Sequence, residues 1–402
     1  MRTCTLAVGL VPAGPLSTGR TSGLAKLTFS RRRQRHGQAT GFQPVVVDTP
    51  ATPTPRRTVT MERRGRRRFE TPWGSLMGAL PSDTGRSERP YAPPGRVARL
   101  AGVWAPPPTP FVGGVADGAR LVDLAGRLLA AGCDGLCPFG TTGEGTALGV
   151  DERMRLLEAL VGGGVPAERL VPGVGLPALP DVVRIARAAV GLGCAGVLLL
   201  PPYYHRDATD AGLARFVDEL VDGVADARLR VVLYHIPGTA GIGWSLELVE
   251  ALAARHAGVV VGIKDSSGDW GRLEALVRME PRLAVFAGSE RHLSELLAVG
   301  GAGTISAMAN VVPGRLQAVV DEGSGTEGPG GSQVRADAAR RLVAELGFPM
   351  VPALKALVAH RLGDPAWAEV RAPLVQLGGA DVDRLVETWR AAGLEAVDSF
   401  GP

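Results

Sequence analysis

From residue 100 onward, short apolar runs alternate along the chain with longer stretches in which apolar residues recur at helical spacing. Eight short runs predict strands, over 100–105, 134–139, 170–175, 196–201, 230–236, 259–265, 283–288 and 303–307. The stretches between them are rich in Ala, Leu, Arg and Glu and predict helices over 118–131, 151–162, 180–192, 209–224, 245–256, 269–278 and 290–299. The pattern is that of consecutive βα units.

The predicted strands are nearly continuous apolar runs, which is typical of parallel strands that are covered on both faces. Eight βα units in one domain of about 220 residues predict an α/β protein with a (β/α)8 TIM barrel over 98–321. The Gly/Ser-rich segment 322–333 predicts a linker. Three helical stretches in 334–402, near 334–346, 350–362 and 381–392, predict a small C-terminal helical appendage, with Gly347, Gly363 and Gly393 at the helix ends.

The first 97 residues differ from the rest in composition and charge. Two arginine clusters, at 31–35 and 63–68, lie among Pro, Ser, Thr and Gly without sustained hydrophobic periodicity, so we expect a disordered leader. Residues 1–99 hold 18 Lys and Arg against 5 Asp and Glu, whereas the remainder holds 26 against 35. The leader is consistent with an organelle transit peptide or with a basic arm that binds nucleic acid. A third interpretation is that translation begins downstream, at Met61 or Met77, and that the assigned start lies too far upstream.

Several function classes lack support in the sequence. No apolar run approaches the roughly 18 to 20 residues that a membrane span requires. The four cysteines form no zinc-type pairs, and the six histidines never occur as HxxxH or HxH. The basic charge lies in the leader, so we expect no nucleic-acid binding by the folded body. These patterns predict a soluble, cytoplasmic protein with reduced cysteines and without a metal site.

Lysine is rare in this sequence: of the 44 Lys and Arg residues, only Lys26, Lys264 and Lys355 are lysines. Lys264 lies at the end of the apolar run 259–265. An ammonium is costly to bury there, and a guanidinium, with its very high pKa, does not readily become a neutral nucleophile. A lysine retained at such a position therefore indicates amine chemistry.

Along that strand Val260, Gly262 and Lys264 share one face by the two-residue alternation. If this face lines the barrel interior, burial favours the free amine that attacks a carbonyl carbon. The alternative is a structural lysine that is paired with Asp265 or another carboxylate.

Five short motifs stand at the ends of predicted strands: GTTGE at 140–144, PPYY at 201–204, YHIP at 234–237, GIKD at 262–265 and GTISAMANVVP at 303–313. In this order they resemble the dihydrodipicolinate synthase/N-acetylneuraminate lyase family, and the resemblance extends from about Leu100 to the C-terminal helices. It implies a class I aldolase in which Lys264 forms a Schiff base with pyruvate or another 2-keto acid. It also implies that the enzyme needs no cofactor.

The resemblance also implies roles for other residues. Tyr234 matches the tyrosine that relays protons, and a phenol beside the lysine is chemically suited to that task. Thr141 and Thr142 match the residues that hold the carboxylate of the keto acid, in a loop whose small residues let backbone amides approach an anion. Thr141 also matches the partner that hydrogen-bonds the catalytic tyrosine. The main-chain carbonyl of Ile305 matches one that faces the bound keto acid.

Tyr204 matches a second tyrosine of the family's proton relay, which is contributed across a subunit interface. The resemblance therefore implies self-association as a dimer or a tetramer. Tyr203 beside it is equally suited to packing. His205 lies in the same predicted rim loop, where we expect an exposed histidine.

The segment after Tyr234 departs from the synthases of this family. They carry there an arginine that binds the carboxylate of the aldehyde substrate, and this sequence has Thr239 in its place. His235 stands where asparagine is frequent, and we expect it to pack or to hydrogen-bond behind the site. We therefore predict an aldolase or lyase for a 2-keto acid and an aldehyde partner. The alternatives are 4-hydroxy-tetrahydrodipicolinate synthase in lysine biosynthesis, a keto-sugar-acid dehydratase, and a non-catalytic ligand-binding barrel.

Overall fold

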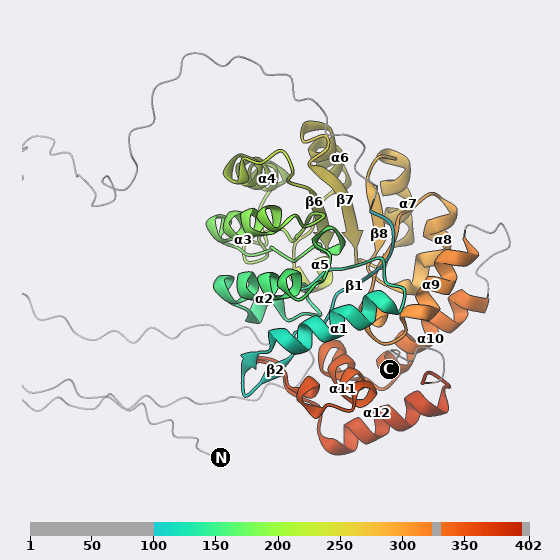
Figure 1. The fold of residues 1–402 in the computed structure, drawn as a ribbon. Coiled ribbons are helices and arrows are strands. Elements are labelled where there is room, and N and C mark those ends of the chain that lie inside the picture. Colours follow the sequence, from blue (N-terminus) through green and yellow to red (C-terminus); the bar gives the residue numbers. More distant parts are fainter. Residues whose placement is uncertain (1–99, 324–330, 396–402) are drawn as a thin grey trace, which may run out of the picture. The chain divides into compact units, whose positions relative to one another are not determined.

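The computed structural model describes residues 100–323 and 331–395, and its centre is a curled parallel sheet surrounded by helices (Figure 1). Seven strands follow one another in the order β4-β1-β9-β8-β7-β6-β5. Their bounds are β1 Gly102–Ala105, β4 Gly135–Leu136, β5 Val197–Leu199, β6 Val231–His235, β7 Val260–Asp265, β8 Ala284–Ala287 and β9 Gly303–Ile305. Each of these strands lies within one of the predicted runs.

The segment around Leu170 and Gly173 supplies the eighth strand position and closes the sheet between β4 and β5. Parallel bridges join Leu136 to Leu170 and Gly173 to Leu198. The amide of Val171 donates to Leu136 at 2.9 Å, and that of Val174 donates to Leu198 at 3.0 Å. The predicted (β/α)8 barrel is therefore confirmed, with its eighth strand reduced to isolated bridges.

The outer ring consists of α1 Gly118–Ala130, α2 Val150–Gly162, α3 Leu179–Leu192, α4 Asp210–Val224, α6 Leu246–Arg255, α7 Trp270–Met279, α8 Leu293–Ala298 and α9 Pro313–Glu322. Capping side chains start four of these helices, because Asp117, Thr209, Ser245 and Asp269 each accept a hydrogen bond from a first-turn amide. The helix α9, which begins with Pro313 at its first helical turn, is not among the predicted helices. The short helix α5 Pro237–Ala240 and the hairpin of β2 Phe111–Val112 and β3 Val115–Ala116 were not predicted either.

The C-terminal helices are α10 Gly331–Glu345, α11 Met350–Leu362 and α12 Gly379–Ala391. The predicted linker, 322–333, is wrong at its end, because α10 already begins at Gly331. Gln333 is buried there, where it donates to the Glu290 carbonyl at 2.7 Å and accepts from the Ser294 amide at 2.9 Å. These contacts stabilise a polar segment as helix, and no sequence pattern shows them. Residues 324–330 lie outside the described residues.

Two apolar clusters divide the core. One cluster combines strand with helix residues and fills the space between the sheet and the outer ring. The other cluster fills the barrel itself, and its buried members are Trp104, Cys137, Val171, Leu198, Val232, Tyr234, Ala284, Phe286, Ala302 and Ile305. Functional side chains that point into the barrel are therefore surrounded by apolar atoms.

The strand β7 departs from simple alternation. Its register pairs Val231 with Val260 but Val232 with Gly262, so Val261 is an additional residue in this strand, which is a β-bulge. Val260 consequently packs in the outer cluster, whereas Val261 packs against the inner one. The prediction that Val260 shares a face with Lys264 is therefore wrong, and the run VVVG gives no signal that places a bulge.

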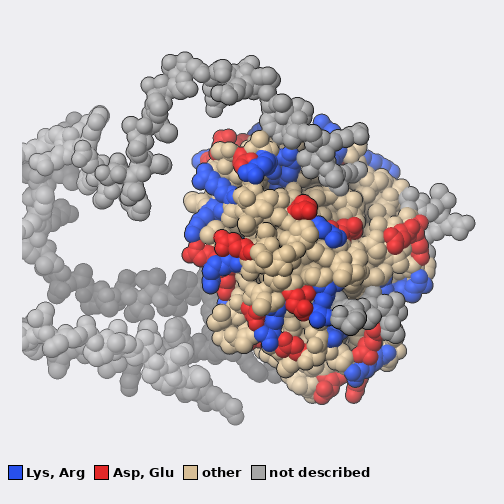
Figure 2. Space-filling model, viewed as in Figure 1, with Lys and Arg blue, Asp and Glu red and all other residues tan. Residues whose placement is uncertain are grey.

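Several other expectations concern what the chain lacks. Within the described ranges no single helix is long and apolar enough to cross a membrane. The helices α10 and α11 together have the required length and apolar composition, but the chain bends by 116° between them. The same ranges hold no cluster of three or more metal-ligating side chains. The visible face of the folded body mixes acidic and basic side chains over apolar and neutral surface (Figure 2). The predicted leader, 1–97, lies outside the described residues.

The contact between Trp104 of β1 and Gly135 of β4 allows a test of the packing inside the barrel. Trp104 pairs with Gly135, and a Cβ on Gly135 would lie 2.3 Å from the Trp104 ring. We expect Gly135→Ala to lower the free energy of unfolding by about 1–3 kcal/mol, as overpacking does. The measurement is the urea midpoint at constant m-value. The control is Gly126→Ala in α1, which has open space around it and is expected to be neutral or stabilising; an equal loss in both variants would contradict the packing.

Candidate active site

Lys264 and Tyr234 lie side by side on neighbouring strands inside the barrel. The register of β6 and β7 pairs the two residues directly. The Nζ atom of Lys264 lies 4.2 Å from the centroid of the Tyr234 ring. Only 5% of Lys264 and 3% of Tyr234 are exposed. An amine and a phenol that the sequence singled out separately thus meet in one buried place.

The neighbour of Lys264 on the other side, on β8, is apolar. Phe286 is its register partner on β8, and both Phe286 and Ile305 belong to the buried cluster that fills the barrel. Burial raises the pKa of the Cys137 thiol to about 12, although the positive charge of Lys264 acts in the opposite direction. Cys137 therefore stays an uncharged thiol at neutral pH and does not balance the lysine's charge.

The carboxylate of Asp265 is bound elsewhere. Its Oδ2 atom accepts from Nε of Arg272 at 2.7 Å, and its Oδ1 atom accepts from the amide of Ser267 at 2.8 Å and from the Ser267 hydroxyl. Within residues 100–323 and 331–395, no carboxylate forms an ion pair with Lys264. This arrangement contradicts the alternative in which Lys264 is a structural lysine paired with Asp265.

The surroundings of Tyr234 change its acidity. Burial by itself raises the pKa of the phenol, but the positive charge of Lys264 and the hydrogen bonds of Thr141 and Ser266 lower it by more. The pKa of Tyr234 therefore lies below that of a free tyrosine. Such a phenol gives up its proton more readily, which suits a group that moves protons in both directions.

The loop 140–145 brings Thr141 to Tyr234. The Thr141 hydroxyl lies 3.4 Å from the Tyr234 hydroxyl, and either oxygen is able to donate. Backbone hydrogen bonds shape the loop, because the amide of Gly145 donates to the Gly140 carbonyl at 3.0 Å. A cavity lies beside Tyr234; Thr141 lines it, whereas Thr142 is buried and does not. The loop therefore offers one of its two predicted threonine side chains to a ligand in that cavity.

A cavity of about 140 Å³ opens beside Tyr234. Its lining residues are Phe139, Gly140, Thr141, Gly145, Thr146, Arg153, Gly173, Gly175, Leu198, Leu200, Tyr203, Tyr234, Ile236, Thr239 and Ala240. Thr239 reaches it from the short helix α5, and Tyr203 reaches it from the loop between β5 and α4. Lys264 is not among the lining residues, but Tyr234 lines the cavity and lies against the amine.

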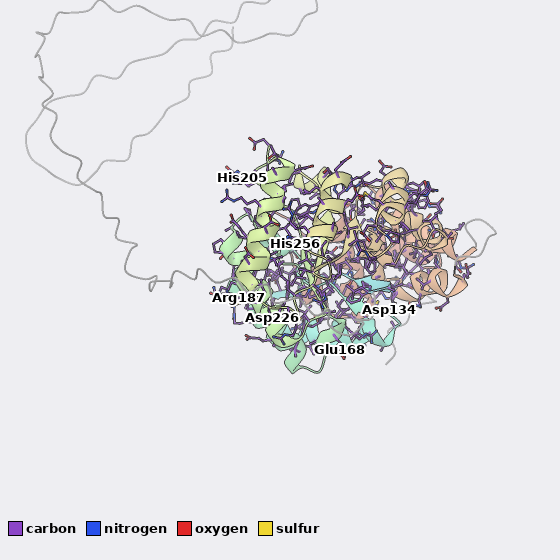
Figure 3. All side chains as sticks on the ribbon, turned by 90° about the horizontal axis from the view of Figure 1, so that it is seen from above. Asp134, Glu168, Arg187, His205, Asp226 and His256 are labelled. Atoms are coloured by element: carbon purple, nitrogen blue, oxygen red, sulfur yellow. The ribbon has the colours of Figure 1, made fainter. Side chains whose placement is uncertain are left out.

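Tyr204 and His205 lie apart from this cavity. Tyr204 is 79% exposed and stacks edge-to-face on His205, with ring centroids 5.7 Å apart. Figure 3 shows His205 at the outer edge of the ribbon. The exposure of His205 agrees with the prediction. Within one chain the structure does not bring Tyr204 to Lys264.

His235 supports the site from behind. The strand β6 places it on the opposite face from Tyr234, where it is buried and its Nδ1 atom accepts a hydrogen bond from the Trp244 amide at 3.0 Å. Burial lowers its pKa, and the nearby Arg272 lowers it further. The prediction of a packed histidine with a hydrogen bond behind the site is therefore confirmed.

Sequence analysis missed two residues of the site. Arg153 belongs to helix α2, where an arginine in an amphipathic pattern predicts solvent exposure, yet it is buried and donates to the carbonyls of Gly173 and Gly145. Ser266 lies close enough to Tyr234 to lower the pKa of its phenol. The signal for Ser266 was present, because it directly follows the Lys264–Asp265 pair in a loop at the barrel rim.

Comparisons with known proteins identify the family of this chain. The model of the dihydrodipicolinate synthetase family matches residues 99–391. The 4-hydroxy-tetrahydrodipicolinate synthase 1 of Streptomyces coelicolor is 38% identical over 273 residues, which cover 66% of this chain and 85% of that protein.

Two crystal structures extend the likeness to the fold. Dihydrodipicolinate synthase from Agrobacterium tumefaciens has a TM-score of 0.67 and 34% identity, and the match covers 72% of this chain and 99% of that one. YagE of Escherichia coli K12, solved in complex with pyruvate, has a TM-score of 0.66 and 25% identity over 73% of this chain and 99% of that one. The chain is thus an enzyme of the aldolase-type lyases, and it belongs to the dihydrodipicolinate synthetase family.

Proposed function

We propose that the protein is a Schiff-base-forming aldolase or lyase, which joins pyruvate or a related 2-keto acid to an aldehyde or cleaves the product of such a reaction. The observation that carries this proposal is a buried amine, Lys264, that lies against the Tyr234 ring and has no carboxylate partner in the part of the chain that the structure describes. The pyruvate complex of YagE supports the choice of keto acid. No cofactor is required, because the protonated imine itself withdraws electrons.

In the proposed reaction the free amine of Lys264 attacks C2 of the keto acid and forms a carbinolamine. Tyr234 donates a proton to the carbinolamine hydroxyl, which leaves as water, and a protonated imine results. The Tyr234 phenolate left by that step takes a proton from C3, which gives an enamine, and C3 then attacks the aldehyde carbon. The aldehyde oxygen takes up a proton through Tyr234, and water releases the product from Lys264. The reverse sequence cleaves the same bond.

The keto acid is oriented by groups around Tyr234. Thr141, whose hydroxyl lies 3.4 Å from that of Tyr234, binds the carboxylate together with the amides of its loop. We assign Thr142 to this loop as a buried support, and the main-chain carbonyl of Ile305 to the opposite side of the keto acid. Thr239 lines the cavity and contacts the aldehyde partner.

The relatives favour a second candidate, 4-hydroxy-tetrahydrodipicolinate synthase, which joins pyruvate to aspartate semialdehyde. Against it stands Thr239, because a hydroxyl makes a weaker bond to a carboxylate than a bidentate guanidinium does. The two candidates share every step at Lys264 and differ only in the aldehyde.

We further propose that the protein self-associates as a dimer or tetramer and acts in the cytoplasm. An aromatic pair at the barrel rim, Tyr204 on His205, is largely exposed in the single chain. Burying Tyr204 against a second copy removes apolar surface from water and brings its hydroxyl towards that copy's relay.

The imine is tested by trapping. Borohydride added with pyruvate is expected to reduce the imine and leave a stable adduct, which peptide mass spectrometry maps to Lys264. Lys264→Arg is expected to give no adduct and to lose more than about 10³-fold in rate, because a guanidinium does not form the imine. An adduct on Lys355, or a Lys264→Arg protein as active as its parent, would sink the proposal.

The contact between the amine and the phenol is tested by titration. In Lys264→Met the positive charge that lowers the pKa of Tyr234 is absent, while the effect of burial, which raises it, remains. We therefore expect the Tyr234 phenol to ionise at higher pH than in the parent protein. Ultraviolet absorbance follows the phenolate, and the curve of Tyr234→Phe is subtracted as the control. Identical curves in parent and Lys264→Met would contradict the contact.

The choice of aldehyde is tested at position 239. We expect Thr239→Arg to raise kcat/KM for aspartate semialdehyde by about tenfold or more, because a guanidinium then meets the substrate carboxylate. Activity with an uncharged aldehyde of similar length serves as the control and is expected not to rise. Efficient condensation of aspartate semialdehyde by the unmodified protein would instead establish the second candidate.

A further inference from the structure

We propose that Glu144, held by Lys355 and Arg371, is a positioning residue that fixes the loop 140–145 for the carboxylate of the keto acid. The C-terminal helices would thereby act on substrate binding as well as on the fold. This inference rests on the proposed function, because it assigns a task to the loop that carries Thr141.

The ion pair between Lys355 and Glu144 is fully enclosed. Lys355, from helix α11, is 0% exposed, and Glu144 is 4% exposed. The Nζ atom of Lys355 donates to Oε1 of Glu144 at 2.7 Å and to the carbonyl of Thr109 at 2.8 Å. The ammonium also lies 4.5 Å from the centroid of the Phe111 ring. A residue 211 positions away in sequence therefore holds the loop from the side of the C-terminal helices.

The second oxygen of Glu144 is bound by the segment that follows α11. The backbone amide of Arg371 donates to Oε2 of Glu144 at 2.9 Å. The guanidinium of Arg371 forms a two-pronged ion pair with Glu152 in α2, at 2.6 and 2.7 Å, and donates to the Ala147 carbonyl at 3.0 Å. Arg371 thus ties the loop and the helix that follows it to one point.

The residues on either side of Glu144 are anchored as well. The Thr109 hydroxyl donates to the Gly143 carbonyl at 2.7 Å, and the Arg153 guanidinium donates to the Gly145 carbonyl. A Cβ on Gly145 would lie 2.0 Å from the Phe139 carbonyl, so the backbone is in close contact with its neighbours. Three successive residues, 143–145, are therefore fixed to three different parts of the chain.

This anchoring overcomes a backbone preference. Glu144 has φ of 52°, in the left-handed region that a residue with a side chain rarely adopts. Such a conformation persists only where surrounding contacts determine it. The turn it completes includes the hydrogen bond from the Glu144 amide to the Thr141 carbonyl, at 3.2 Å. Release of Glu144 is therefore expected to displace Thr141. Even a small displacement of a group that binds the substrate weakens binding.

The test compares variants of the full-length protein by borohydride trapping at increasing pyruvate concentration. Glu144→Gln and Lys355→Met remove the ion pair, and Thr109→Val removes the hydrogen bond on Gly143 without changing charge or size. We expect each to raise the half-saturating pyruvate concentration by about tenfold or more, while the trapping rate at saturating pyruvate falls less than about threefold. Circular dichroism identifies the variants that fold, and Thr109→Val is the mildest of the three.

Leu385→Ala is the control, because Leu385 is buried in α12, another of the C-terminal helices, which packs against α10 and α11. It is expected to lower Tm and leave the half-saturating concentration unchanged. Unchanged half-saturation in folded Thr109→Val and Glu144→Gln, or an equal rise in Leu385→Ala, would overturn the inference. Absence of any adduct in the parent protein would refute the proposed function instead, so the two failures are distinguishable.

Discussion

The site depends on an amine, that of Lys264, which is buried without a carboxylate partner among the residues that the structure describes. Removing an ammonium from water costs several kcal/mol, and a cation–π contact of the kind that Lys264 makes with Tyr234 returns only about 0.5–2 kcal/mol. The nearest acid in sequence, Asp265, is satisfied by Arg272 and Ser267. The barrel therefore holds Lys264 in a place that contributes little to stability, and no ion pair with a described carboxylate occupies its amine.

The rest of the barrel maintains this arrangement. The register of β6 and β7 sets the phenol beside the amine, and the bulge at Val261 keeps Gly262 and Lys264 facing inward at the end of the strand. The loop 140–145 then adds Thr141 above the phenol. A shift of one residue in β7 would turn Lys264 towards the helices, so the strand register is as important to the chemistry as the residues themselves.

Sequence periodicity predicted the parts of the fold that repeat. Continuous apolar runs predicted the strands and helical spacing predicted most of the helices, because each follows from burial of one element against the next. The bulge at Val261 was not predictable, because neighbouring apolar residues look alike on either face. The start of α10 at Gly331 was missed because Gln333 is held by tertiary hydrogen bonds. Arg153 was missed because its partners are backbone carbonyls from distant positions, which leave no mark in the sequence.

The described part of the chain contains two lysines, Lys264 and Lys355, and both are buried. Lys355 is neutralised by Glu144, so its ammonium is an acceptable structural cation, and its protons are committed to Glu144 and Thr109. Lys264 has no carboxylate partner among the described residues and lies against the Tyr234 ring instead. Residue type alone made both lysines candidates for an imine, and the position of one carboxylate separates them. The described part of the chain thus keeps its two lysines in opposite surroundings, one paired with a carboxylate of the loop 140–145 and one lying against a phenol.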